Sequence, residues 1–305
     1  MNVTTVAVSG VAKRYGSVEA VRDVTFELTE GETVALVGHN GAGKTTLIKL
    51  MLGLIRPSTG SVLVLGEDPA KGDFEVRRRL GYLPESVSFH MALTGRETLA
   101  FYARLKRVEV SSVPELLEQV GLAPDAADRP VRTYSKGMRQ RLGLAQALLG
   151  HPRVLLLDEP TSGLDPALRR RFYDILDGLR SAGTTILLSS HALTELEGRA
   201  DRVVIVNEGV KVADGSLDTL RGLAQLPTRV SVRLANGKST ADWNAGGGWR
   251  ITGVDTVETE VAMDEKVALL REVTANPAEV AGLQLVEPTL DDLYAHFLGG
   301  RKAAE

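Results

Sequence analysis

One short stretch near the N-terminus constrains the fold more than any other part of the sequence. Residues 38–45 read GHNGAGKT and fit the pattern G-x-x-x-x-G-K-[ST]. The β-rich run 33–37 precedes this stretch, and helical spacing of apolar residues begins at Thr45. A strand, a glycine-rich turn and a helix in this order direct backbone N–H groups and a helix N-terminus at an anion. The segment is predicted to bind nucleotide phosphates, with a chance glycine-rich turn as the alternative.

Two side chains of this loop carry most of its expected chemistry. Lys44 is expected to reach the β- and γ-phosphates, and the Thr45 hydroxyl is expected to bind Mg²⁺. The residues assigned to nucleotide binding in this segment are Gly38, His39, Asn40, Gly41, Ala42, Gly43, Lys44, Thr45 and Thr46.

Two adjacent acids follow an apolar run farther along the chain. The run 155–157 is Leu-Leu-Leu, and Asp158 and Glu159 come directly after it. Asp158 is expected to support Mg²⁺ through its water shell, and Glu159 to polarise the attacking water as general base. Neighbouring residues of a strand point to opposite sides, so both acids reach one ligand only where the backbone is distorted. The alternative is a strand end with two exposed acids.

A serine between these motifs marks the start of a helix. The segment 134–140 reads YSKGMRQ, and Ser135 is predicted to cap the helix that contains 136–149. A helix N-terminus with a serine and a glycine also suits a γ-phosphate. The structural and the functional interpretations are compatible.

Strand-like and helix-like segments alternate along the first two thirds of the chain. This alternation predicts a doubly wound α/β core, with a mostly helical region at about 86–150. The expected strands are 3–8, 24–28, 33–37, 153–157, 185–189 and 203–206, and the expected helices are 97–106, 113–120, 136–149, 168–182 and 192–199.

The composition changes near Leu226-Pro227, which predicts a nucleotide-binding domain over 1–225 and a small α+β domain over 226–305. In the second domain the expected elements are strands at 229–234, 248–251, 256–262 and 283–286, helices at 265–274 and 290–298, and a loop at 244–248.

Charge and cysteine content exclude several functions. The net charge is -3, which gives no global attraction to nucleic acid, and no nucleic-acid partner is expected. The basic runs 77–79 and 169–171 are interpreted as solvated helix faces. With 0 cysteines the chain has no disulfide or thiolate metal site. No stretch approaches the roughly 20 apolar residues that span a bilayer, so work at a membrane would need another chain to cross it.

Taken in order, these motifs resemble those of ABC transporter nucleotide-binding subunits over residues 1 to about 217. The resemblance implies an α/β P-loop NTPase of the ABC type, with a helical subdomain and a small C-terminal α+β domain. It also implies an ATPase that binds ATP and Mg²⁺. It assigns adenine stacking to Tyr15, the Q-loop position to Glu85 and the switch position to His191. The signature positions fall on Ser135, Lys136, Gly137 and Met138, and the D-loop comprises residues 162–165, which end at Asp165.

Three residues depart from the family pattern. Glu85 stands where a glutamine usually contacts Mg²⁺ and the attacking water, and a carboxylate also accepts hydrogen bonds from that water. Lys136 and Met138 replace the usual glycine and glutamine of the signature. Gly137 is retained, so hydrolysis is expected to be retained. The catalytic residues implied are Glu159, His191 and Glu85, and the metal-binding residues are Thr45, Glu85 and Asp158.

The resemblance implies a head-to-tail homodimer that buries two ATP molecules, each between one chain's phosphate loop and the other chain's signature. It also implies a multi-span permease partner and a peripheral location on the cytoplasmic face of the bacterial inner membrane. Within the family, 38–150 looks like the ATPase that supports copper–sulfur centre assembly of nitrous-oxide reductase in denitrifying bacteria, where a periplasmic accessory protein is a further partner. The alternatives are a multidrug or other exporter of the same branch and a mechanical ATPase that drives no transport.

Overall fold

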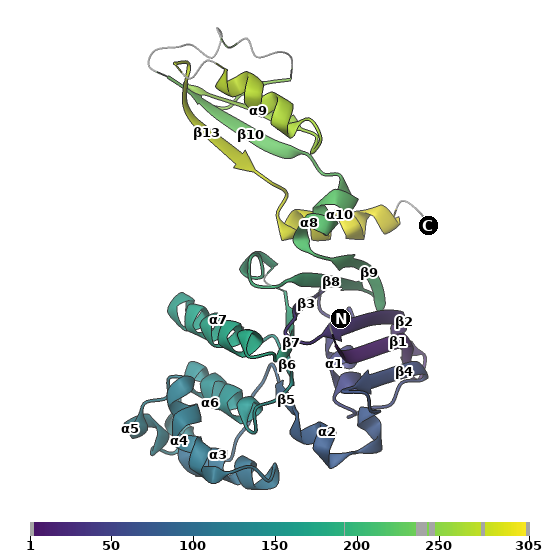
Figure 1. The fold of residues 1–305 in the computed structure, drawn as a ribbon, viewed down its shortest axis with the longest axis vertical. Helices are drawn as coiled ribbons and strands as arrows, with labels where there is room; N and C mark the ends of the chain where they lie inside the picture. Colours follow the sequence, from purple (N-terminus) through teal and green to yellow (C-terminus); the bar gives the residue numbers. More distant parts are fainter. Residues whose placement is uncertain (1–2, 192, 236–242, 244–247, 276–277, 303–305) are drawn as a thin grey trace. The chain divides into compact units, whose positions relative to one another are not determined.

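The computed structural model describes residues 3–191, 193–235, 243, 248–275 and 278–302. The chain divides into two compact units, Met1–Asp214 and Gly215–Glu305 (Figure 1). The division precedes the change predicted at 225/226, because helix α8 (Leu217–Ala224) belongs to the second unit.

A six-stranded sheet forms the centre of the first unit, with strand order β5-β6-β7-β3-β8-β9. Every residue of β3, β6 and β7 is buried, as expected for apolar strands that are covered on both faces. The pairs β5–β6, β6–β7, β7–β3 and β3–β8 are all parallel. The strands are β3 (Thr33–Val37), β5 (Leu80–Leu83), β6 (Val154–Asp158), β7 (Thr185–Ser190), β8 (Arg202–Asn207) and β9 (Val210–Gly215).

A separate antiparallel sheet has the order β2-β1-β4. The strands predicted at 3–8 and 24–28 belong to β1 and β2, whereas β4 and the separate sheet were not predicted. Its strands are β1 (Thr4–Tyr15), β2 (Val18–Thr29) and β4 (Thr59–Val64). The apolar face of this sheet shares one core cluster with helix α1 (Lys44–Met51) and with β3. Helix α1 is thereby held between two sheets, and the phosphate loop at its start has a rigid support.

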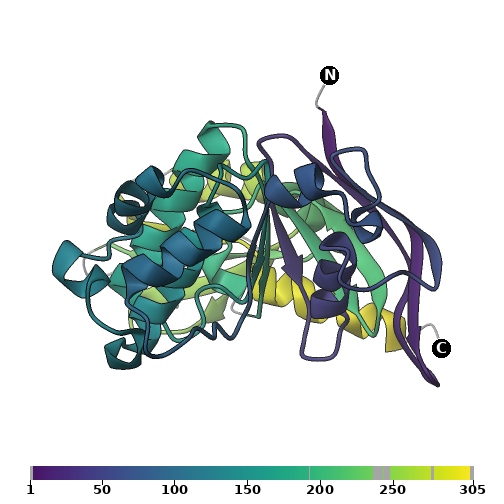
Figure 2. The ribbon, with the colours of Figure 1, turned by 90° about the horizontal axis from the view of Figure 1, so that it is seen from below.

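The helices predicted within 86–150 are present. They are α3 (Gly95–Leu105), α4 (Val113–Gln119), α5 (Pro124–Ala127) and α6 (Lys136–Leu148), and α7 (Pro166–Ser181) follows β6. A capping box between Thr94 and Glu97 fixes the start of α3. In the first unit these helices lie on one side of the parallel sheet and the antiparallel sheet lies on the other (Figures 1 and 2). The short helix α2 (Phe74–Arg78) precedes β5.

The helix predicted at 192–199 is wrong. Within its described residues only a short 3₁₀ turn forms, at Leu193–Glu195. Gly198 has a φ of 72°, a left-handed conformation that ends a right-handed helix.

The second unit is a four-stranded antiparallel sheet of order β11-β12-β10-β13 with helix α9 against one face. Val230, Val232 and Leu234 of β10 form its core together with Val273 of α9. The bounds are β10 (Thr228–Leu234), β11 (Arg250–Ile251), β12 (Thr256–Val261), β13 (Val280–Val286), α9 (Lys266–Thr274) and α10 (Leu290–Lys302). The loop predicted at 244–248 lies outside the described residues except for Gly248.

In the described part of the chain, no helix has both the length and the apolar character to cross a bilayer.

Candidate nucleotide site

The phosphate loop joins the end of β3 to the start of α1, and its glycines are required by close packing. Gly43 has a φ of 104°, and a Cβ there would lie 2.7 Å from the carbonyl oxygen of Ala20. A Cβ on Gly38 would lie 2.5 Å from the carbonyl oxygen of Val206. Since side chains at these positions would clash with backbone, the loop holds its shape only with glycine.

Lys44 is 6% exposed and its side chain turns back over its own loop. The ammonium donates hydrogen bonds to the carbonyl oxygens of Gly38 (2.5 Å) and His39 (3.3 Å). It also lies 3.6 Å from Oε1 of Glu159. A positive charge is therefore fixed beside the backbone N–H groups that begin α1, where phosphates would bind.

Asp158 is the last residue of β6 and is 3% exposed. Its Oδ2 accepts a hydrogen bond from the Thr45 hydroxyl at 3.0 Å, and its Oδ1 accepts one from the Ser189 hydroxyl at 2.6 Å. The same Ser189 oxygen accepts the backbone N–H of Glu159 at 3.0 Å. Ser189, on β7, thus fixes both acids of the motif.

The backbone is distorted at the residue after the strand. Glu159 has a φ of 48°, in the left-handed region that non-glycine residues seldom adopt. Its Oε2 lies 2.6 Å from Nδ1 of His191 and 3.3 Å from the backbone nitrogen of His191. The turn at Glu159 brings its carboxylate to the same cavity that Asp158 lines.

A cavity of about 410 Å³ gathers most of the predicted residues. Tyr15 lies at its border and is 47% exposed, with the Lys13 ammonium 5.2 Å from its ring centroid. An exposed aromatic face at the edge of a phosphate site suits a stacked base. The lining residues are Tyr15, Ala20, His39, Asn40, Gly41, Gly43, Lys44, Thr45, Thr46, Glu85, Asp158, Glu159 and His191.

Seven predicted residues do not line this cavity. Gly38 and Ala42 contribute packing of the loop instead. Ser135 caps α6 by accepting the backbone N–H of Met138 at 3.3 Å, and Asp165 caps α7 by accepting that of Leu168 at 2.9 Å. Ser135, Lys136, Gly137, Met138 and Asp165 therefore sit at two helix starts outside the cavity of their own chain.

Thr45, Asp158 and Glu85 carry oxygen atoms of the kind that Mg²⁺ prefers. Mg²⁺ prefers oxygen ligands and takes few of them from protein, keeping several waters and adding phosphate oxygens. The Thr45 hydroxyl and an Asp158 carboxylate oxygen are already 3.0 Å apart, and Glu85 lines the same cavity.

Glu85 follows β5 and lies next to residues that face a second cavity. That cavity, of about 660 Å³, is lined by Pro84 and Ser86 on either side of Glu85, and by apolar residues such as Tyr102 and Leu105. Consecutive residues of one segment thus face two cavities. Tyr82 also lines the second cavity. Its burial and, to a smaller extent, the negative charge of Asp158 raise the pKa of Tyr82 to about 12, so its phenol stays neutral.

Sequence reasoning missed two residues of the site. Ser189 orients both acids, and the serine that ends the apolar run 185–188 was the signal available for it. Ala20 lines the cavity next to Gly43 because β2 passes beside the loop, and its small side chain carries no sequence signal.

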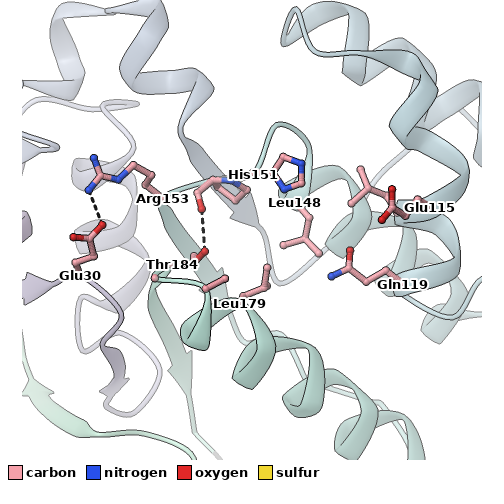
Figure 3. A pocket seen from close by; sticks show the side chains of 12 residues that line it. Glu30, Glu115, Gln119, Leu148, His151, Arg153, Leu179 and Thr184 are labelled. Atoms are coloured by element: carbon pink, nitrogen blue, oxygen red, sulfur yellow. Dashed lines mark hydrogen bonds and ion pairs between the residues drawn. The ribbon is translucent and has the colours of Figure 1, made fainter.

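Another cavity, of about 580 Å³, contains none of the predicted residues (Figure 3). Glu30 and Arg153 form an ion pair of 2.8 Å at its wall, and Thr184 donates a hydrogen bond to the carbonyl oxygen of Pro152 at 3.2 Å. Glu115 adds a second acid. Because its arginine is paired and its other charges are acidic, this cavity is poorly suited to triphosphate binding.

Comparisons with known proteins identify the family of the chain. The family model described as "ABC transporter" matches residues 21–162. The uncharacterized ABC transporter ATP-binding protein all4389 of Nostoc sp. (strain PCC 7120) is 46% identical over 210 residues, which are 67% of this chain and 62% of that relative. The daunorubicin resistance ATP-binding protein DrrA3 of Streptomyces coeruleorubidus is 34% identical over 313 residues, covering 97% of this chain and 96% of DrrA3.

Two solved structures are also similar. A structure described as the ATP binding subunit of an ABC transporter has a TM-score of 0.68 and 33% identity, and the match covers 72% of this chain and 93% of that one. The dimeric structure of MJ0796, a bacterial ABC transporter cassette, has a TM-score of 0.65 and 23% identity, and the match covers 70% of this chain and 98% of that one.

Proposed function

This chain belongs to the ABC transporter ATP-binding family and is the ATPase subunit of such a transporter, and from this we propose that it energises an exporter. One observation carries the proposal. The match to DrrA3, a daunorubicin resistance protein, extends over nearly the whole of both chains and so includes the second unit. The proposed cargo is a drug, as the name of DrrA3 indicates for that relative.

Glu159 is the proposed general base of the hydrolysis. Its carboxylate lies in the cavity beside Lys44 and His191, and it is held by the strained backbone and by Ser189. His191 orients it through the 2.6 Å contact of Nδ1. Lys44 attracts the phosphates, and Thr45, Asp158 and Glu85 would hold Mg²⁺, which supplies charge neutralisation between phosphate oxygens.

The site needs a second chain to be complete. The predicted signature and D-loop residues lie outside the cavity of their own chain, at the starts of α6 and α7. A head-to-tail homodimer supplies Ser135 and Gly137 of one chain to the ATP of the other. The dimeric form of the structurally similar MJ0796 supports this assembly. ATP then favours the closed dimer, because only that state has both sets of contacts.

The apolar cavity beside Glu85 is the proposed docking place for the permease. Leu105 lines this cavity and is 60% exposed, and Phe101 of the same helix α3 is 50% exposed, so a partner that binds here would cover apolar surface. Since Pro84 and Ser86 line this cavity while Glu85 lines the nucleotide cavity, movement at one cavity is transmitted to the other.

Co-expression with a multi-span permease tests the export proposal. Inside-out vesicles that contain both chains are expected to accumulate a fluorescent anthracycline when ATP is added, and vesicles with a Glu159→Gln chain are expected not to. Accumulation that does not depend on ATP would contradict the proposal.

The more specific prediction, support of copper–sulfur centre assembly of nitrous-oxide reductase, stays a prediction. It rests on the segments 38–46, 81–106 and 133–150, parts of which other exporters of the branch share. A gene neighbourhood with a six-helix permease, a repeat-rich periplasmic protein and a multicopper reductase would favour it over drug export. A mechanical ATPase would show ATP turnover with the permease but no cargo movement.

A further inference from the structure

Glu195 lies four residues after His191, in the 3₁₀ turn Leu193–Glu195, and connects three segments of the first unit. Its carboxylate accepts a hydrogen bond from the hydroxyl of Thr161 at 3.2 Å and forms an ion pair with Arg169. The Glu195 side chain is 21% exposed, so the pair is partly shielded from solvent.

The guanidinium of Arg169 contacts the D-loop as well as Glu195. Its Nε donates a hydrogen bond to the carbonyl oxygen of Leu164 at 2.9 Å, while its Nη1 pairs with Glu195. The basic run 169–171 was interpreted as a solvated helix face, and for Arg169 this is wrong. Its planar, forked donors suit a bridge between a carbonyl and a carboxylate.

The segments that Arg169 and Glu195 join lie close in sequence to Glu159 or to His191. Thr161, 7% exposed, follows Glu159 by two residues, and the carbonyl oxygen of Pro160 between them accepts a hydrogen bond from the Gln140 amide of α6 at 3.0 Å. On the other side of the D-loop, the Lys136 side chain lies over Gly163, where a Cβ would come within 2.5 Å of its ammonium. The D-loop is therefore held between the signature helix and the segment that carries His191.

We propose that Arg169 and Glu195 are positioning residues that couple the D-loop to the switch segment of His191. The inference rests on the proposed ATPase dimer, in which the D-loop faces the partner chain. When the dimer closes, a movement of the D-loop would reach Arg169 through its bond to Leu164, and then Glu195. From Glu195 the movement would pass along the chain to His191, and through Thr161 to Glu159. Neither residue lines the nucleotide cavity, so neither is expected to bind ATP.

Steady-state phosphate release by the full-length dimer tests the coupling. Arg169→Ala and Glu195→Ala are each expected to lower kcat about 10- to 100-fold, since small misplacements of reacting groups have effects of this order. KM and the Kd for a fluorescent ATP analogue are expected to stay within about 3-fold of wild type, because the groups act after binding. The double variant is expected to be no slower than the slower single variant, since both changes break one connection.

Conservative variants separate positioning from simple loss of stability. Glu195→Gln keeps an acceptor for Thr161 and Arg169 and is expected to recover at least part of the kcat that Glu195→Ala loses. Asp177→Asn is the matched control, because Asp177 pairs with Arg199 at 3.2 Å from the same helix α7 without touching the D-loop. Its kcat is expected to match wild type.

Two outcomes would overturn the coupling. One is a kcat for the alanine variants that equals that of Asp177→Asn. The other is a loss of kcat accompanied by an equal rise in KM and a lowered melting temperature, which would mark the pair as structural only. A wild-type chain that binds no ATP would instead contradict the proposed function itself.

Discussion

Oε2 of Glu159 lies 2.6 Å from Nδ1 of His191, while Oε1 of the same carboxylate lies 3.6 Å from the Lys44 ammonium. One carboxylate thus lies between the proposed phosphate-binding lysine and the proposed switch histidine. In the proposed ATP complex, phosphate oxygens would compete with Glu159 for the charge of the Lys44 ammonium.

Replacing Glu159 by glutamine tests its role as the base. The amide keeps the size and hydrogen bonding of the side chain but cannot take a proton, so the hydrolysis rate is expected to fall about 10²–10⁴-fold. Removing a negative charge beside the phosphates is expected to preserve or strengthen ATP binding. Phosphate release and size-exclusion chromatography with ATP are the measurements, and an accumulated closed dimer is the expected result.

Two controls frame this experiment. Lys44→Ala is expected to lose both ATP binding and the dimer, and Asp158→Asn to lose activity through Mg²⁺ and through its bond to Thr45. Near-normal hydrolysis by Glu159→Gln, without an ATP-stabilised dimer, would falsify the assignment of the base.

The exposed ring of Tyr15 predicts a change in adenine affinity. Base stacking on an aromatic ring contributes roughly 1–3 kcal/mol, so Tyr15→Ala is expected to weaken ATP binding by about 5- to 150-fold. Tyr15→Trp is expected to remain near wild type. Phe101→Ala is a matched control, since Phe101 is 50% exposed against 47% for Tyr15 and does not line the nucleotide cavity. Equal affinities of Tyr15→Ala and Phe101→Ala for ATP would refute stacking.

The boundary between the two units predicts different behaviour for two truncated chains. A chain that ends at Asp214 keeps the whole first unit and is expected to bind ATP as the full chain does. A chain that ends at residue 225 keeps α8 but loses the Arg221–Glu287 ion pair of 2.9 Å and exposes the fully buried Leu220. It is therefore expected to bind ATP equally well but to aggregate more readily, as sedimentation would reveal. Greater solubility of the longer chain would contradict this boundary.

Lys106 predicts a dependence of stability on pH. It donates hydrogen bonds to the carbonyl oxygens of Leu80 (2.9 Å) and Leu149 (2.7 Å), and burial lowers its pKa from 10.5 to about 8. Between about pH 8 and pH 10.5 the unfolded chain binds more protons than the folded one, so the free energy of unfolding gains a contribution that rises with pH. Below about pH 8 both states are protonated and the contribution is constant.

Lys106→Met removes this titration. The free energy of unfolding of wild type, relative to that of the variant, is expected to increase by at most about 1.4 kcal/mol per pH unit above pH 8. Urea unfolding at pH 7.5 and at pH 9.5 measures the difference, and Lys71→Met, at an exposed lysine, is the control. Parallel curves for wild type and Lys106→Met would show that the ammonium does not lose its proton in this range.

Much of the fold followed from local patterns. Apolar runs without charge predicted β3, β6 and β7, and helical spacing predicted α3, α4, α6 and α7. In the antiparallel sheet the strands at 3–8 and 24–28 were predicted, but the second half of β1 was missed because alternation breaks at Gly10, where φ is 56° and the pairing register shifts between Val8 and Val11. The ion pair between Arg221 of α8 and Glu287 joins residues that are far apart in sequence. Such contacts depend on tertiary structure and leave no local periodicity.

The site was predictable in its residue types but not in its geometry. Motif spacing identified Lys44, Asp158 and Glu159, whereas the left-handed backbone at Glu159 depends on the bond from its N–H to Ser189 on another strand. The bridge from Arg169 to Glu195 was hidden for a similar reason. Residues 169–171 are all arginine, so the sequence does not distinguish one from another. Only the packing of α7 shows that Arg169, the first of them, contacts the D-loop.

The position of β3 in the sheet has a consequence for synthesis of the chain. β3 leaves the ribosome early, yet its two neighbours are β7 and β8, which begin about 150 residues later. At about 5–20 residues per second, that segment takes roughly 8–30 s to translate. During this interval the uncharged strand 33–37 has no sheet partners from its own chain and is a target for chaperones or for pairing with other nascent chains. A pause in translation before β8 is made is therefore expected to prolong the time for which β3 lacks its two sheet partners.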